Sequence, residues 1–141
     1  MKNEINVLDE LNKGACMGMD AIKFILDKVE DKKLYDVLEK QYDKYEDISK
    51  KIHKLYPDCN KKPHETNTMN KVMTWYGIEI RTLTDQSTSK IAELLLQGTN
   101  MGIIEGRKLL NHKDVDEETR NLAEEYVAMQ EDAVEKLKSF L

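Results

Sequence analysis

Three histidines and two cysteines are the side chains of this sequence best suited to bind a metal or to act in catalysis. Metal sites and catalytic bases need such groups at fixed spacings, for example Glu-x-x-His along a helix or paired cysteines in a short loop. No histidine lies three residues after a glutamate; the histidines and the residues three places before them are His53 and Lys50, His64 and Lys61, and His112 and Leu109. We therefore expect no catalytic histidine, and we interpret His53 as a partly exposed residue of a helix.

The two cysteines, Cys16 and Cys59, show neither a Cys-x-x-Cys spacing nor a secretory context. Cysteines of this kind are more often inert thiols than a disulfide or a metal site. The sequence also has no phosphate-binding loop, no dinucleotide-binding glycine motif after a strand and no nucleophile elbow. The stretch Gly98-Thr-Asn-Met-Gly102 lies within a predicted helix and follows no strand, so it does not predict a phosphate cradle. We predict that the protein is not an enzyme and has no cofactor.

The composition excludes several other classes of protein. The 141 residues suit one domain, 1–141, and 22 Lys plus Arg against 27 Asp plus Glu give a net charge of −5. The basic residues form pairs rather than a stripe, which disfavours nucleic-acid binding. The longest uncharged stretch, Leu94 to Ile104, has 11 residues and is too short to cross a bilayer. No apolar signal segment follows Met1, so we expect a cytoplasmic protein without a membrane partner.

Helices must position most of these groups, because apolar residues recur three and four apart along nearly the whole chain. The first hairpin, about 5–56, contains two such stretches. Only four polar residues separate them, and Asp31 among these is suited to cap the second helix. Pro57 and Pro63, the only two prolines, indicate a loop over 57–65.

The second half of the chain repeats this organisation after a short helix over 66–84. Polar residues at 85–89 break the helical pattern, because short polar side chains compete with the helix backbone. A fourth helix is predicted from about 89 to 110. The last helix is predicted from about 117 to 140, with Asp114 or Asp116 as its cap.

The two hairpins, about 5–56 and 89–141, resemble one another in sequence. Leu11 to Gly18 aligns with Leu95 to Gly102, 84 residues further on, and both stretches contain Gly-x-x-Met-Gly. The partner helices align 85 residues apart, with Lys51 matching Lys136 and Tyr45 matching Gln130. One interpretation is that any two amphipathic helices align this well. The sharper one is a duplicated hairpin packed about a pseudo-twofold axis.

Two helical hairpins joined by a long connection resemble the ferritin-like superfamily, including small bacterial four-helix-bundle proteins that lack its di-iron ligands. The resemblance covers nearly the whole chain. It implies an all-α fold, a ferritin-like antiparallel four-helix bundle with its third helix broken near 85–89. Di-iron members carry Glu on two helices and Glu-x-x-His on the other two. The corresponding places here hold other residues; they are Lys13 and Gln97 on the first and fourth helices, and Tyr42 and Val127 three residues after Glu39 and Glu124. We therefore expect no metal centre.

Five of the six glycines come as Gly-x-x-x-Gly steps inside the two helices that the repeat relates. Glycine within a helix costs about 0.5–1 kcal/mol relative to alanine, so these positions need a reason. Small residues let helices approach closely. We predict that Gly14, Gly18, Gly98 and Gly102 lie at helix crossings, with Gly18 and Gly102 where the first and fourth helices meet.

Four polar residues lie on or near the apolar stripes of the second and last helices. They are Gln41, Tyr45, Tyr126 and Gln130, which we call the polar seam, and the repeat matches Gln41 with Tyr126. Buried polar groups must be hydrogen-bonded, so we interpret the polar seam as a network that fixes the register of the bundle. The alternative is a small polar cavity that binds a ligand.

The third helix carries a second apolar stripe, formed by Val72, Trp75 and Ile78. Such a stripe must be covered by the bundle itself or by another subunit. We predict a homodimer with Trp75 in or near the interface.

Together these features favour a non-catalytic helical-bundle protein that acts in protein interaction or assembly, as a homodimer or with an unidentified protein partner. Two alternatives stay open. One is a degenerate ferritin-like metal-binding or oxidoreductase protein with a site built from Glu39, Glu105 and Glu124. The other is a small-ligand binder that uses the polar seam.

Overall fold

The computed structural model describes the backbone of residues 2–55 and 67–141 and the side chains of 3–55 and 74–141. Every regular element in these ranges is helical, as the apolar spacing predicts. The elements are α1 (Lys2–Ile25), the short 3-10 helix η1 (Leu26–Lys28), α2 (Lys32–Leu55), α3 (Asn67–Arg81), α4 (Thr88–His112) and α5 (Glu117–Lys138). The all-α class is confirmed, while the loop predicted over 57–65 lies outside the described residues.

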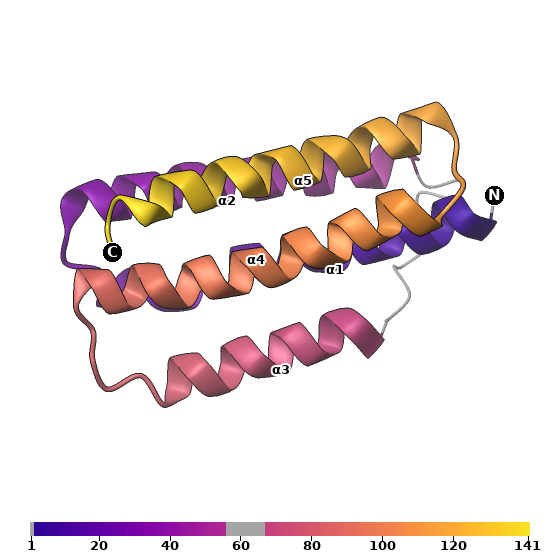
Figure 1. Cartoon of the computed structure of the whole chain (residues 1–141). Coiled ribbons are helices and arrows are strands. Elements are labelled where there is room, and N and C mark those ends of the chain that lie inside the picture. The colour runs from indigo at the N-terminus through magenta and orange to yellow at the C-terminus, as the bar shows by residue number, and fades with distance from the viewer. Residues whose placement is uncertain (1, 56–66) are drawn as a thin grey trace.

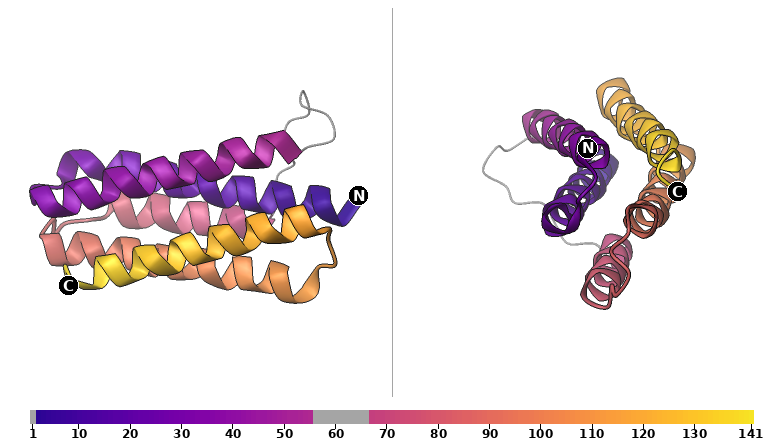
Figure 2. Two further views of the ribbon diagram at one scale, coloured as in Figure 1. Left: turned by 90° about the horizontal axis from the view of Figure 1, so that it is seen from above. Right: turned by 90° about the vertical axis from the view of Figure 1, so that its left-hand side faces the viewer.

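The four long helices form two antiparallel hairpins that pack side by side (Figure 1). α1 pairs with α2 and α4 with α5, and the hairpins meet where α1 lies beside α4 and α2 beside α5. Neighbouring long helices run in opposite directions, and α1 begins at the end of the bundle opposite to the one where α5 ends. The turned views in Figure 2 show α3 outside this arrangement, along the face between α1 and α4. α3 runs in the same direction as α1.

The predicted caps are present at two helix starts. The Asp31 carboxylate accepts a hydrogen bond from the backbone N–H of Leu34 at 2.9 Å, at the start of α2. Of the two candidates for α5, Asp116 is the cap, and it accepts from the N–H of Thr119 at 2.9 Å. This N–H donor lowers the pKa of Asp116, because it stabilises the ionised carboxylate. Local sequence therefore determines where these two helices begin.

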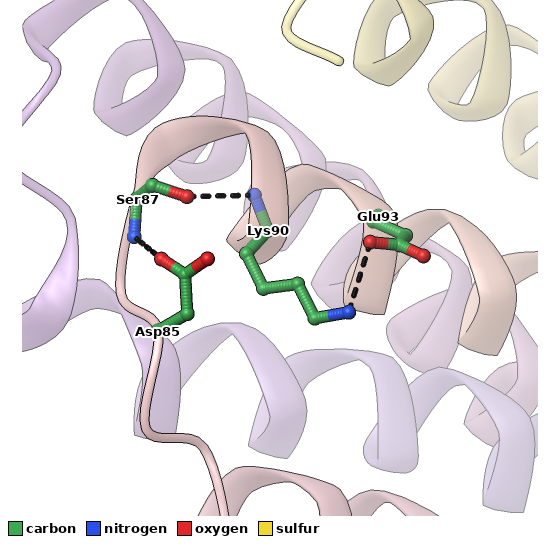
Figure 3. Close-up of polar contacts among 4 residues, drawn as sticks. All are labelled: Asp85, Ser87, Lys90 and Glu93. Carbon is green, nitrogen blue, oxygen red and sulfur yellow. Dashed lines mark hydrogen bonds and ion pairs between the residues drawn. The ribbon is translucent and has the colours of Figure 1, made fainter.

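The break between α3 and α4 comes slightly earlier than predicted, because α3 ends at Arg81 rather than near residue 84. The hydroxyl of Thr82 donates to the carbonyl of Ile78 at 2.8 Å, and the backbone N–H of Thr82 donates to the same carbonyl at 3.0 Å. Figure 3 shows how α4 then begins. The Asp85 carboxylate accepts from the N–H of Ser87 at 2.9 Å, and the Ser87 hydroxyl accepts from the N–H of Lys90 at 3.3 Å.

The core lies between the two hairpins and follows the apolar stripes that the sequence predicts. Its most completely buried large side chains include Leu8, Leu11, Ile25, Leu34, Leu38, Ile48, Ile52, Ile91, Tyr126 and Leu137. Burying a side chain of this size contributes about 1.5–3 kcal/mol. The hairpins are therefore held together mainly by these apolar stripes. The polar residues buried among them do not contribute in this way and need a separate explanation.

All six glycines lie inside helices, as predicted, but their neighbours correct the predicted crossing of α1 and α4 at Gly18 and Gly102. A Cβ atom on Gly18 would lie 2.5–2.8 Å from ring atoms of Tyr45 on α2. A Cβ atom on Gly102 would meet the side-chain amide of Gln130 on α5, and one on Gly98 would meet the Tyr76 ring on α3. The nearest atoms thus belong to other helices than the predicted α1 and α4 pair. These glycines leave room for large side chains, and Gly14 is simply buried.

Candidate functional site

The polar seam is buried between α2 and α5. Gln41, Tyr45, Tyr126 and Gln130 are each at most 5% exposed. The amide nitrogen of Gln130 donates to the hydroxyl of Tyr45 at 3.4 Å, and this bond joins the two hairpins. Because the repeat matches Tyr45 with Gln130, a contact between them places both beside the pseudo-twofold axis. The sequence match therefore has a counterpart in the packing.

The glycines extend this correspondence between the hairpins. Within the first hairpin, Gly18 of α1 accommodates Tyr45 of α2, and within the second, Gly102 of α4 accommodates Gln130 of α5. The repeat relates the two glycines to one another and the two side chains to one another. We call these places the Gly18 slot and the Gly102 slot. The same backbone arrangement thus carries an aromatic side chain in one hairpin and an amide in the other.

Two residues that the sequence analysis did not single out adjoin the polar seam. The Tyr76 hydroxyl donates to the carbonyl of Leu95 at 3.4 Å, and the Thr99 hydroxyl donates to the same carbonyl at 2.7 Å. Both side chains are buried. The signal for Thr99 was its place inside the repeated Gly-x-x-Met-Gly pattern, where the first hairpin has Ala15.

Burial controls the ionisation of the three tyrosines in this region. It raises the pKa of Tyr45, of Tyr76 and of Tyr126 above the ordinary value of 10.0, because a phenolate would lose its water. The three phenols are therefore neutral at neutral pH. Neutral phenols can donate and accept hydrogen bonds, but they supply neither a base nor an activated nucleophile.

The polar seam is hydrogen-bonded only in part, which corrects the prediction of a fully satisfied network. Three of its buried atoms have no hydrogen-bond partner among the described residues: the amide nitrogen of Gln41, the hydroxyl of Tyr126 and the amide oxygen of Gln130. Gln41 and Tyr126 each lie one helical turn before the Tyr45–Gln130 contact on antiparallel helices. Their backbone positions are therefore on opposite sides of it.

The structure does not bring the alternative metal ligands together. Within the part of the chain that it describes, no three Asp, Glu, His or Cys side chains could hold one ion. Glu39 is exposed on α2, Glu105 approaches Lys108 at 3.7 Å on α4, and Glu124 pairs with Arg120 at 3.4 Å on α5. These carboxylates thus belong to separate parts of the surface.

The histidines and cysteines that the structure describes do not form a site either. His53 and His112 are both exposed, and His112 is the last residue of α4. Burial raises the pKa of the Cys16 thiol, which makes it less reactive. Cys59 and His64 lie outside the described residues.

An apolar groove between α1 and α3 is the second candidate site. It has a volume of about 270 Å³ and is lined by Met17, Asp20, Ala21, Phe24, Tyr76, Gly77, Ile80 and Arg81. The Phe24 side chain at its edge is 64% exposed. A Cβ atom on Gly77 would have no neighbour within 4 Å, so the α3 side of the groove is open. An exposed aromatic beside an open apolar groove is typical of a surface that contacts another protein.

The three predicted interface residues have different surroundings. Ile78 is 47% exposed, on the outer side of α3. Trp75 is partly buried against the core, and its ring meets that of Tyr76 edge to face, with centroids 5.3 Å apart. The side chain of Val72 lies outside the described residues. Of the two that are described, Ile78 is the more available for contact.

The opposite face, formed by α2 and α5, is charged. Lys51 approaches Glu125 at 2.6 Å and Asp47 at 3.2 Å, while its repeat match Lys136 approaches Asp132 at 3.0 Å. All these side chains are largely exposed, so each pair contributes little to stability. Several charges of this face are therefore already paired within the chain.

Comparison with known proteins adds no relative, because no family model, curated protein or solved structure matches the chain. None of the helices in the described ranges is long and apolar enough to span a membrane. The surfaces and buried groups described above are therefore the basis for a functional proposal.

Proposed function

We propose that this is a non-catalytic helical-bundle protein that acts by protein contact, and that it assembles with a second copy of itself through the α1–α3 face. The apolar groove with the exposed Phe24 at its edge carries this proposal. A surface of this kind gains stability when another apolar surface covers it, because apolar area leaves water. The partner is a second copy because the same face offers both an apolar projection and a groove.

The charges around the groove support self-association. Asp20 lines its α1 side and Arg81 its α3 side, so one face presents both signs. Two copies of such a face can be complementary to each other, as the twofold contact of a homodimer requires.

Sedimentation velocity at micromolar concentration tests the proposal, and we expect a dimer. Phe24→Ser should shift the protein towards the monomer, because it removes the exposed apolar projection and leaves the core intact. Ile104→Ser is the matched control, since Ile104 is 53% exposed on α4 and does not line the groove. A monomeric wild-type protein, or equal behaviour of the two variants, would contradict the proposal.

One observation favours a second candidate function, the binding of a small polar ligand at the polar seam. Buried polar atoms of Gln41, Tyr126 and Gln130 lack partners in the described part of the chain. Groups of this kind gain from any hydrogen-bonding molecule that reaches them. Native mass spectrometry of the purified protein checks this, and a retained small molecule that Gln41→Leu abolishes would support it.

We also propose, from the helix order and the internal repeat, that the chain is a small bacterial cytoplasmic member of the ferritin-like superfamily without the di-iron ligands. Two antiparallel hairpins packed side by side support this relationship. The correspondence of the Gly18 and Gly102 slots supports the duplication on which it rests. An experimental structure of a relative with intact ligands would test it by the superposition of the four long helices.

A further inference from the structure

We propose that α3 is a displaceable cover of a helix-binding groove on the bundle. α1 and α4 form this groove, and α3 of the same chain occupies it (Figure 2). The partner that fits the groove is an amphipathic helix with an aromatic side chain as its anchor, because α3 itself presents such an anchor there. Displacement of α3 does not require the proposed self-association, so either can fail without the other.

A single buried side chain attaches the described part of α3 to the bundle. Of residues 74–81, only Tyr76 is buried, while Trp75 and Ile80 are partly buried. The four long helices, in contrast, bury side chains along most of their length. Elements with few buried contacts open locally at a smaller cost than the whole protein. α3 is therefore the helix that can leave while the two hairpins stay packed.

The anchor occupies a place that α4 provides. A Cβ atom on Gly98 would collide with the Tyr76 ring, so this place exists because Gly98 has no side chain. The Tyr76 hydroxyl donates to the Leu95 carbonyl at 3.4 Å, and the Thr99 hydroxyl donates to the same carbonyl at 2.7 Å. The carbonyl therefore keeps a hydrogen bond when Tyr76 leaves. An aromatic ring of similar size from another helix can take the same place.

The charged side chains of α3 add nothing to this attachment. Glu79 and Arg81 form no ion pair with the residues that the structure describes. Arg81 instead donates from Nε to the carbonyl of Gly77 at 3.1 Å, within its own helix. This hydrogen bond moves with α3 and does not hold it to the hairpins.

Gly77 makes α3 a weaker helix than its packing requires. Glycine inside a helix is less favourable than alanine. Gly18, Gly98 and Gly102 each have a side chain of another helix at the place of the missing Cβ. Gly77 has nothing within 4 Å of that place, so packing within the chain does not require a glycine here. α3 has only 15 residues, and an isolated helix of this length is marginal in water.

Release of α3 would uncover apolar surface that another helix can cover. Met17 and Ala21 of α1 lie beside α3 and are each 4% exposed. Together with the place at Gly98 on α4, they offer an apolar floor with room for one large side chain. An amphipathic helix binds such a groove with its apolar face and anchors itself by a large side chain.

Trp75, the only tryptophan of the chain, reports the position of α3 by its quenching with acrylamide. Tyr76→Ser should increase this quenching, and Gly98→Leu should do the same although Tyr76 is still present. Helical circular dichroism should show that the long helices stay folded in both. Ile78→Ser is the matched control, because it removes a side chain of α3 that is already 47% exposed, and Trp75 should stay shielded. All proteins also carry Phe24→Ser, so that self-association does not contribute.

A labelled peptide of residues 67–84 tests the groove itself, by fluorescence anisotropy with the full chain. The peptide should bind the Tyr76→Ser protein about tenfold or more tightly than the protein with Tyr76. A peptide with Tyr76→Ala should not bind, and neither should the original peptide to a protein with both Tyr76→Ser and Gly98→Leu. Gly77→Ala in the Tyr76→Ser protein should weaken peptide binding about two- to fivefold, because its own α3 becomes a better helix.

Two sets of results would overturn the proposal. If Trp75 stays shielded in both variants, or if Tyr76→Ser unfolds the long helices, α3 is a fixed part of the fold. If α3 is released but the two peptides bind equally or not at all, no helix-binding groove with an aromatic anchor lies beneath it.

Discussion

The two hairpins use the same backbone arrangement for different side chains. In the first hairpin, the Gly18 slot holds the rigid ring of Tyr45, and in the second, the Gly102 slot holds the flexible amide of Gln130. The two side chains then meet each other between the hairpins. Because the two side chains differ, Gln130 donates the hydrogen bond and Tyr45 accepts it. The difference teaches that two hairpins with similar packing can hold unlike side chains at matching places, and that the polar contact between the hairpins uses this difference.

The largest expected effect comes from filling the two slots. Gly18→Ala should destabilise the protein by about 2 kcal/mol, because a Cβ atom would press on a buried ring that cannot bend away. Gly102→Ala should cost about 1 kcal/mol or less, since the end of the Gln130 side chain can rotate. Denaturant unfolding of both variants measures the difference. Equal losses would show that the two slots are equally rigid.

The next effect concerns the hydroxyls of the polar seam. Tyr45→Phe should cost about 1–2 kcal/mol, because it leaves the Gln130 amide nitrogen without its partner in a dry core. Tyr126→Phe is the matched control and should stay within about 0.5 kcal/mol, since its hydroxyl has no partner among the described residues. Thermal or denaturant unfolding distinguishes them. A larger loss for Tyr126→Phe would contradict the assignment of the hydrogen bond.

The smallest effect is expected on the charged face. Lys51→Ala should cost slightly more than Lys136→Ala, because Lys51 approaches two carboxylates and one belongs to the other hairpin. Both losses should stay below about 1 kcal/mol and shrink in high salt, because exposed pairs are screened. Unfolding measurements at low and high ionic strength check this. A larger loss for Lys136→Ala would show that the contact between hairpins adds nothing.

Much of the fold follows from local sequence signals. Asp31 and Asp116 cap helices because a short carboxylate next to free N–H groups satisfies them in any context. The end of α3 differed from the prediction by three residues, and at this place the Thr82 hydroxyl bonds back to its own helix. Such a contact depends on a rotamer that the sequence does not specify.

The candidate sites were harder to predict than the fold. The sequence shows that a glycine lacks a Cβ atom, but it does not show which helix fills the space, so the slots were assigned to the wrong pair of helices. The repeat correctly matched Tyr45 with Gln130. It did not show that Gln41 and Tyr126 lie on opposite sides of that contact, which follows from the antiparallel direction of α2 and α5.

The groove was missed because neither of its main residues gives a periodic signal. Phe24 lies off the apolar stripe of α1, and Gly77 is a single residue without a side chain within α3. A large apolar residue off the stripe was the available sign. Phe24 indicates a groove only when α3 is known to pack beside α1, and this packing depends on the whole fold.

The position of α3 has a consequence for the symmetry of the molecule. The pseudo-twofold axis exchanges α1 with α4, and these two helices are antiparallel, so a single helix along them must run parallel to one and antiparallel to the other. α3 connects the two hairpins, and it therefore cannot follow the pseudo-twofold symmetry that relates them. It gives the bundle a direction along the helix axes. On the α4 edge, the Tyr76 ring closes over Gly98. On the α1 edge, the groove beside Gly77 stays open, so the two edges of α3 differ.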